Sequence, residues 1–117
     1  LNYMVVILNR RFNMEYEYIR TDNYLDIDRV FSGRSRERLA SINLKEVEKI
    51  GVLSENDSFD VKKKLLCTNP DDELFYIIFK HPKHGKTICV FSPDDRLKEG
   101  LKFYIPRQVW FDAFGRN

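Results

Sequence analysis

The sequence lacks the features that mark a disulfide-rich protein or a hydrolytic enzyme. It has two cysteines, Cys67 and Cys89, which lie far apart and form no CxxC pattern. This spacing indicates neither a disulfide framework nor a zinc knuckle, so we expect two buried thiols in a protein of a reducing compartment. There are two histidines and no GxSxG, P-loop or HExxH motif. We therefore predict a protein that is not an enzyme, with no catalytic residue, cofactor or metal.

A strong charge of one sign is also missing. The 117 residues contain 20 basic and 18 acidic side chains, which gives a formal net charge of +2. This total does not by itself demand a nucleic-acid partner, so any anion binding has to come from local clusters. By contrast, 43% of the residues are hydrophobic and 14% are aromatic, which excludes a disordered chain. The length is that of one domain.

A run long enough to cross a bilayer is absent, although the amino terminus is apolar. The first eight residues carry no charge and are followed closely by Arg10 and Arg11. A spanning helix needs about 20 apolar residues, but an arginine pair after an apolar stretch is typical of the cytoplasmic end of such a helix. Two interpretations stay open. Residues 1–13 are either the end of a truncated membrane anchor or a segment whose Val5 and Ile7 cover part of the folded domain.

From residue 14 to residue 110 the sequence predicts one β-rich domain. Residues 15–19 alternate polar with aromatic or aliphatic side chains, which is the period of a half-buried strand. Later runs are almost continuously apolar, as expected where both faces of a strand are covered. Residues 47–50 fit either a strand boundary or one helical turn. We expect seven strands, near residues 15–19, 25–31, 40–44, 50–53, 59–67, 74–79 and 88–91.

The period then changes to that of a helix. At residues 92–95 a serine that can cap, a proline suited to the first helical position and two aspartates indicate a helix start. Gly100 weakens the helix slightly and Pro106 ends it. One apolar stripe needs a core to cover; it consists of Leu97, Leu101, Tyr104 and Ile105. The predicted fold is therefore mainly β, an antiparallel seven-stranded barrel or sandwich that one C-terminal helix closes.

This order of elements resembles the pleckstrin-homology (PH) fold. Residues 38–50 read RLASINLKEVEKI and resemble a passage of bacterial PH-like domains. The chain is also similar, over about residues 9–110, to an uncharacterised family of small membrane-tethered proteins of Gram-positive bacteria. The resemblance implies a non-catalytic binding or scaffolding module at the cytoplasmic face of the membrane, which contacts a protein or anionic lipid.

Two clusters of basic residues are candidates for anion or partner binding. In the first, Glu37 is the only acid among four arginines, whose guanidinium groups could hold phosphate or carboxylate; these are Arg29, Arg34, Arg36 and Arg38. Phosphoinositide-binding PH domains carry their basic residues around an early hairpin, which here has Asp22 and only Arg20. A plain solvated turn is the alternative interpretation of the arginines.

The second cluster is a hairpin without acids that contains Lys80, Lys83 and Lys86 together with His81 and His84. Near a membrane each cation would contribute about 1 kcal/mol of attraction to anionic head groups. An ordinary solvated loop is again the alternative, and the histidine pair lacks a third ligand for a metal. We interpret the lysines at 62–64 as protection of an edge strand.

The tail after Pro106 contains the only tryptophan. Trp110 and Phe111 either pack back on the domain or present an aromatic patch to a partner or the membrane interface. We place the end of the domain at residue 110, so that residues 111–117 form a tail. The alternative function is a small nucleic-acid-binding β domain. It would use the arginines at 34, 36 and 38, with Tyr16 and Tyr18 as surface platforms for base stacking.

Overall fold

The computed structural model describes residues 3–10, 14–31 and 34–115, the first of these ranges by its backbone alone. The described residues form eight strands, two α-helices and one short 3₁₀-helix. The strands are β1 Tyr3–Arg10, β2 Met14–Thr21, β3 Tyr24–Phe31, β4 Ser35–Asn43, β5 Lys49–Val52, β6 Lys63–Leu66, β7 Phe75–His81 and β8 Gly85–Phe91. The helices are η2 Leu44–Glu46, α1 Asp95–Tyr104 and α2 Arg107–Phe114.

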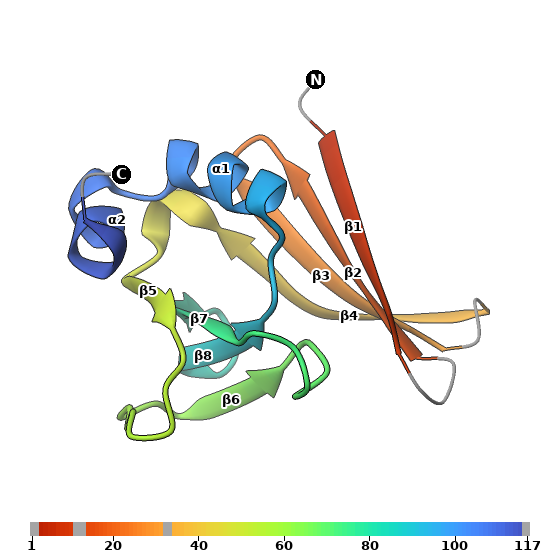
Figure 1. The fold of residues 1–117 in the computed structure, drawn as a ribbon. Helices are drawn as coiled ribbons and strands as arrows, with labels where there is room; N and C mark the ends of the chain where they lie inside the picture. The colour runs from red at the N-terminus through yellow and green to blue at the C-terminus, as the bar shows by residue number, and fades with distance from the viewer. Residues whose placement is uncertain (1–2, 11–13, 32–33, 116–117) are drawn as a thin grey trace.

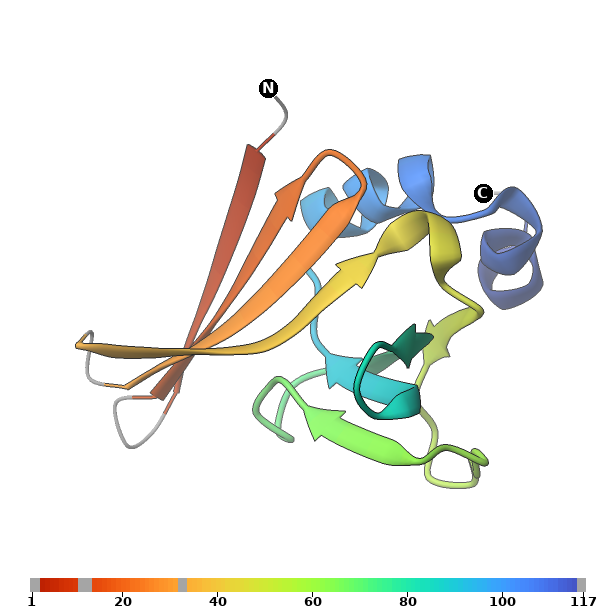
Figure 2. The ribbon, with the colours of Figure 1, turned by 180° about the vertical axis from the view of Figure 1, so that it is seen from behind.

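The strands form two four-stranded sheets. The first has the order β1-β2-β3-β4 and is antiparallel throughout, and the second has the order β5-β7-β8-β6. In the second sheet β6 pairs parallel with β8, while the other pairs are antiparallel. Figures 1 and 2 show the long first sheet standing at an angle to the second. The predicted mainly β fold is confirmed, but its barrel alternative is wrong, because the described strands divide into two separate sheets. The parallel β6–β8 pair also departs from the predicted antiparallel pairing.

The core lies between the two sheets and under α1. Alternation in β2 buries Tyr16 and Tyr18 while the glutamates beside them stay partly exposed. Tyr18 ties the sheets together: its hydroxyl donates to the Cys67 carbonyl oxygen at 2.7 Å and accepts from the Ser92 amide at 3.1 Å. Cys67 and Cys89 are free and fully buried in this core, as predicted.

Helix α1 closes one end of the core, across the opening between the sheets (Figure 1). Its predicted stripe is confirmed, since Leu97 and Leu101 are fully buried and Ile105 is 3% exposed. The cap is Asp94, whose side chain accepts from the Leu97 amide at 2.7 Å. The sequence had pointed to Ser92, but the helix starts at Asp95 and places Asp94 in the capping position.

A second helix, which the sequence analysis missed, follows directly. Pro106 ends α1 as predicted, yet it also serves as the residue before α2, because its fixed φ is compatible with the start of a helix. Helix α2 lies beside β5. The prediction of one C-terminal helix is therefore wrong, and the predicted tail at 111–117 begins inside α2.

Two further differences concern the strands. Residues 3–10, which the sequence analysis assigned to a lead segment, form β1 and pair with β2 along its whole length; Arg11 lies outside the described residues. The predicted strand at 59–67 is shortened to β6. The segment before β6 instead folds over the outer face of the second sheet, where Phe59 and Val61 pack against Tyr76, Ile78 and Ile88. Residues 47–50 lead from η2 into β5, and Lys49 begins the strand.

Candidate anion-binding surface

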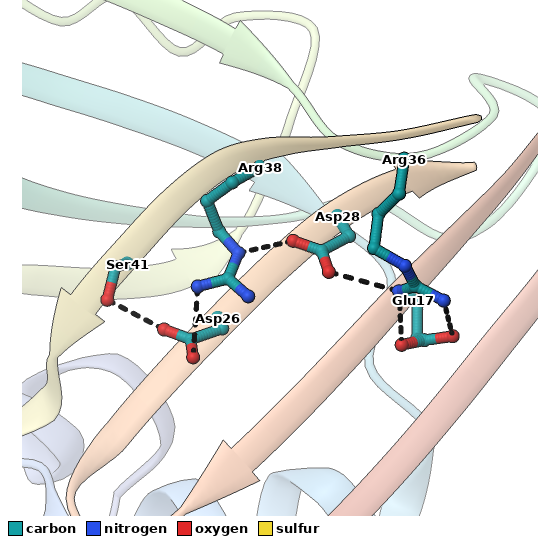
Figure 3. A network of polar contacts seen from close by, with 6 residues as sticks. All are labelled: Glu17, Asp26, Asp28, Arg36, Arg38 and Ser41. Carbon is teal, nitrogen blue, oxygen red and sulfur yellow. Dashed lines mark hydrogen bonds and ion pairs between the residues drawn. The ribbon is translucent and has the colours of Figure 1, made fainter. Parts of the chain in front are cut away.

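Two of the four arginines predicted to bind an anion, Arg36 and Arg38, lie in a charge network on the outer face of the first sheet (Figure 3). Both terminal nitrogens of Arg36 donate to the Glu17 carboxylate, at 2.6 and 3.4 Å, and one also donates to Asp28 at 3.1 Å. These hydrogen bonds, chiefly the one to Glu17, raise the pKa of Arg36. Arg36 thus joins β4 to carboxylates on both β2 and β3.

Arg38 extends the same network. Its Nε donates to Asp28, and one terminal nitrogen forms an ion pair with Asp26 at 3.2 Å. The Ser41 hydroxyl donates to the second Asp26 oxygen at 2.6 Å. The Asp28 carboxylate, whose side chain is 2% exposed, therefore lies between two guanidinium groups that are each half exposed. The network holds three carboxylates against two arginines, so it carries no surplus of positive charge.

Arg29 also has an acidic partner, because it donates to Glu37 and the hydrogen bond raises the pKa of Arg29. Arg34 is exposed and forms no ion pair with any described residue. Binding of an external anion by these four arginines stays a prediction. The acids around Arg36 and Arg38 result from strand register, which places Asp28 of β3 opposite β4 and Glu17 of β2 opposite Asp28. The linear sequence did not show this arrangement.

The two tyrosines that the nucleic-acid alternative requires for base stacking are not at the surface. Tyr16 is 7% exposed and Tyr18 is fully buried. The prediction that these two rings form a surface for bases is wrong, because both face the core on the inner side of β2.

The second predicted cluster is larger than the sequence indicated. Parallel pairing places β6 beside β8, and the Lys62 amide donates to the Lys86 carbonyl oxygen at 2.8 Å. Lys80 lies directly opposite Lys86 in the β7–β8 pair. The lysines at 62–64, interpreted from sequence as edge protection, thus join the hairpin lysines at one end of the second sheet. We call this set the lysine surface; it consists of Lys62, Lys63, Lys64, Lys80, Lys83 and Lys86.

Within the described ranges, no acidic side chain compensates the charges of the lysine surface. All six side chains are exposed, and none forms an ion pair with a residue that the structure describes. Like charges placed directly opposite each other in a strand pair are destabilising, which applies to Lys80 and Lys86. Strand β6 is also an edge strand, as its lysines predicted. The lysine surface therefore concentrates positive charge that does not stabilise the fold.

The hairpin that carries three of these lysines has an ordered turn. The Nδ1 atom of His81 accepts from the Lys83 amide at 3.0 Å and from the His84 amide at 3.2 Å. Partial burial, His81 and the nearby lysines 63 and 83 lower the pKa of His84. In the described part of the chain, no group of three or more potential ligand side chains could hold a metal ion.

The aromatic residues of the tail divide between core and surface. Trp110 is 8% exposed and packs against Phe114, with ring centroids 4.6 Å apart. Phe111 is 43% exposed, and Phe103 of α1, which the sequence analysis did not single out, is 81% exposed. Both Phe103 and Phe111 line an open groove between the two helices.

Two angled β-sheets over one core, closed at one end by a C-terminal helix, define a helix-capped β domain, a fold that does not by itself determine the function. The model of the family "Bacterial PH-like domain (DUF6106)" matches residues 1–111, so the chain belongs to this family. Membership confirms the predicted resemblance to bacterial PH-like domains and supports a binding or scaffolding module. PH-like domains are generally non-catalytic. No curated protein and no solved structure matches the chain. Across the described ranges, none of the helices has the length and apolarity that crossing a bilayer requires.

Proposed function

We propose that this PH-like domain is a non-catalytic module that attaches to anionic lipid head groups at the cytoplasmic face of the membrane through its lysine surface. One observation carries the proposal: six exposed lysines, on three strands and the residues adjoining them, lie together without an acidic partner among the described residues. A cation close to an anionic bilayer contributes about 1 kcal/mol. The whole surface therefore offers about 6 kcal/mol, enough for reversible attachment.

The contrast between the two basic clusters supports this assignment. The arginines of β4 are held by carboxylates of their own sheet, so a bilayer would have to compete with Glu17 and Asp28. No carboxylate of the described residues competes in this way for the lysines. Lysine ammonium groups on flexible stems also suit a disordered layer of head groups better than a single fixed ligand.

Vesicle flotation tests the proposal. Wild-type protein is mixed with vesicles of phosphatidylcholine alone or of phosphatidylcholine with phosphatidylserine. We expect flotation with the anionic vesicles only, declining as salt is raised. The triple variant Lys80→Glu, Lys83→Glu, Lys86→Glu should lose it.

The matched control is Arg34→Glu, Lys45→Glu, Arg96→Glu, which changes the net charge by the same amount at exposed positions on other elements. This control should still float. Equal loss in both triple variants would show a general charge effect and overturn the assignment to the lysine surface. Absence of wild-type flotation at low salt would overturn the membrane role itself.

A further inference from the structure

Helix α1 exposes a large apolar side chain on the face turned away from the core. Leu97 and Leu101 point inward, whereas Phe103 is 81% exposed and meets Tyr104 edge-on, with ring centroids 4.9 Å apart. Burial of a phenylalanine side chain is favourable, and Phe103 forgoes this gain in the isolated domain. An exposed ring of this size beside other apolar groups is typical of a contact surface.

Phe103 is one wall of a groove formed where α1 and α2 meet at Pro106. The groove is open and has a volume of about 980 Å³. Phe103, Trp110 and Phe111 supply its apolar lining, and Glu99, Lys102 and Arg107 are the charged residues that line it. The volume is near the upper end of the range of pockets that receive small ligands, so the groove has ample room for an inserted side chain. A concave site of this kind fits a protruding side chain better than a flat bilayer.

The charge of the groove selects for an acidic partner. Lys102 and Arg107 are exposed, and neither forms an ion pair within the ranges described. Glu99 is the one acid among the described lining residues, so two cations face one anion. A second copy of the chain is not favoured by charge, because the chain carries a net charge of +2.

We propose that the groove between α1 and α2 is a docking site for an acidic protein segment that inserts one aromatic or long aliphatic side chain. The inserted side chain would lie between Phe103 and Phe111, and acidic residues on either side would meet Lys102 and Arg107. Aromatic anchors in a partly desolvated pocket, with charges at the rim, carry most of the affinity in such contacts. This site is separate from the lysine surface, so the two proposals can fail independently.

Peptide display provides the probe. A random library is panned against the wild-type domain and counter-selected against Phe103→Ser. Enriched peptides without tryptophan are then synthesised and titrated, with the fluorescence of the chain's single tryptophan as the signal. We expect enriched sequences with acidic residues around one apolar residue. Phe103→Ala should weaken their binding by about tenfold or more, and Lys102→Glu with Arg107→Glu should weaken it at least as much.

The control is the double variant Lys80→Glu with Lys83→Glu, which should leave peptide binding unchanged. Circular dichroism should show that Phe103→Ala is folded, because its ring is exposed. The proposal is overturned by enrichment of basic peptides, by no enrichment over the counter-selecting variant, or by affinity that Phe103→Ala does not alter. A concentration-dependent dimer that Phe103→Ala abolishes would assign the groove to a second copy instead, and loss of vesicle flotation in that variant would assign it to the membrane.

Discussion

Gly100 of α1 lies so close to Arg20 of β2 that a Cβ atom at this position would come within 2.8 Å of the Arg20 Nε atom. Arg20 is 7% exposed, donates to the Asp22 carbonyl oxygen at 2.7 Å and lies over the Tyr104 ring at 5.1 Å. The glycine that weakens α1 as a helix therefore allows a buried guanidinium to lie beneath it.

The first prediction follows from this contact. Helix propensity alone would make Gly100→Ala stabilising by about 1 kcal/mol. We expect the opposite, a loss of about 1 to 3 kcal/mol, because the new methyl group displaces an anchored side chain. Urea titration measures this change in the free energy of unfolding. In an Arg20→Ala background the same change should become neutral or stabilising, and a loss that persists there would contradict the explanation.

The second prediction concerns the buried carboxylate of the charge network. Asp28→Asn removes the charge that Arg36 and Arg38 share. Since both arginines are half exposed, water screens part of the effect, and we expect a loss of about 1 to 3 kcal/mol in the free energy of unfolding. Arg34→Ala, which breaks no ion pair between described residues, should change it by less than about 0.5 kcal/mol. Equal effects of the two substitutions would show that the network does not stabilise the fold.

The third prediction is a loss of stability at alkaline pH. Burial raises the pKa of Tyr18 well above its ordinary value of 10.0. In the unfolded chain this tyrosine ionises near its ordinary pKa, while the folded protein keeps it protonated, so its contribution is complete below pH 10 and falls above it. The expected slope from this one group is about 1.4 kcal/mol per pH unit. Chemical unfolding between pH 9 and pH 11 measures it.

Tyr18→Phe is the control for this experiment. It should reduce stability at neutral pH by about 1 to 3 kcal/mol, because the Cys67 carbonyl and the Ser92 amide lose their partner. Its free energy of unfolding should also fall less steeply with pH in the alkaline range than that of the wild type. Identical slopes in the two proteins would show that Tyr18 titrates normally in the folded state.

The fourth prediction is that the two thiols are unreactive in the folded protein. The Sγ atoms of Cys67 and Cys89 lie 3.2 Å apart with no exposed surface. Their hydrogen bond and their burial raise the pKa of Cys89, and the thiol form is a poor nucleophile. DTNB should label the native protein no faster than it unfolds, and should label both cysteines at once in urea. Rapid native labelling of either cysteine would contradict the burial.

Local patterns were enough to predict the helix that closes the core and the strands that face it. Leu97 and Leu101 recur at helical spacing, and their burial follows from that period alone. The second sheet is harder to predict, because Lys62 reaches Lys86 only through a parallel pairing of distant segments. No spacing in the sequence encodes that contact.

The ion pairs of the charge network were also not predictable from spacing in the sequence. A register shift between Ile27 and Asp28 sets which acid faces which arginine in β4. A shift of one residue turns a side chain to the other face of a sheet. Three of the four clustered arginines, Arg29, Arg36 and Arg38, therefore have acidic partners in the fold that the sequence did not indicate. Helix α2 was missed because Pro106 was interpreted only as a stop signal.

The phenol of Tyr18 contacts the backbone at the end of β6 and again beyond β8, although it belongs to the first sheet. Neither sheet can open without breaking these bonds and exposing the core they share. Amide hydrogens in β2 and in β8 should therefore exchange with deuterium through one common opening, with equal free energies. The domain should behave as a single cooperative unit, despite being built from two sheets.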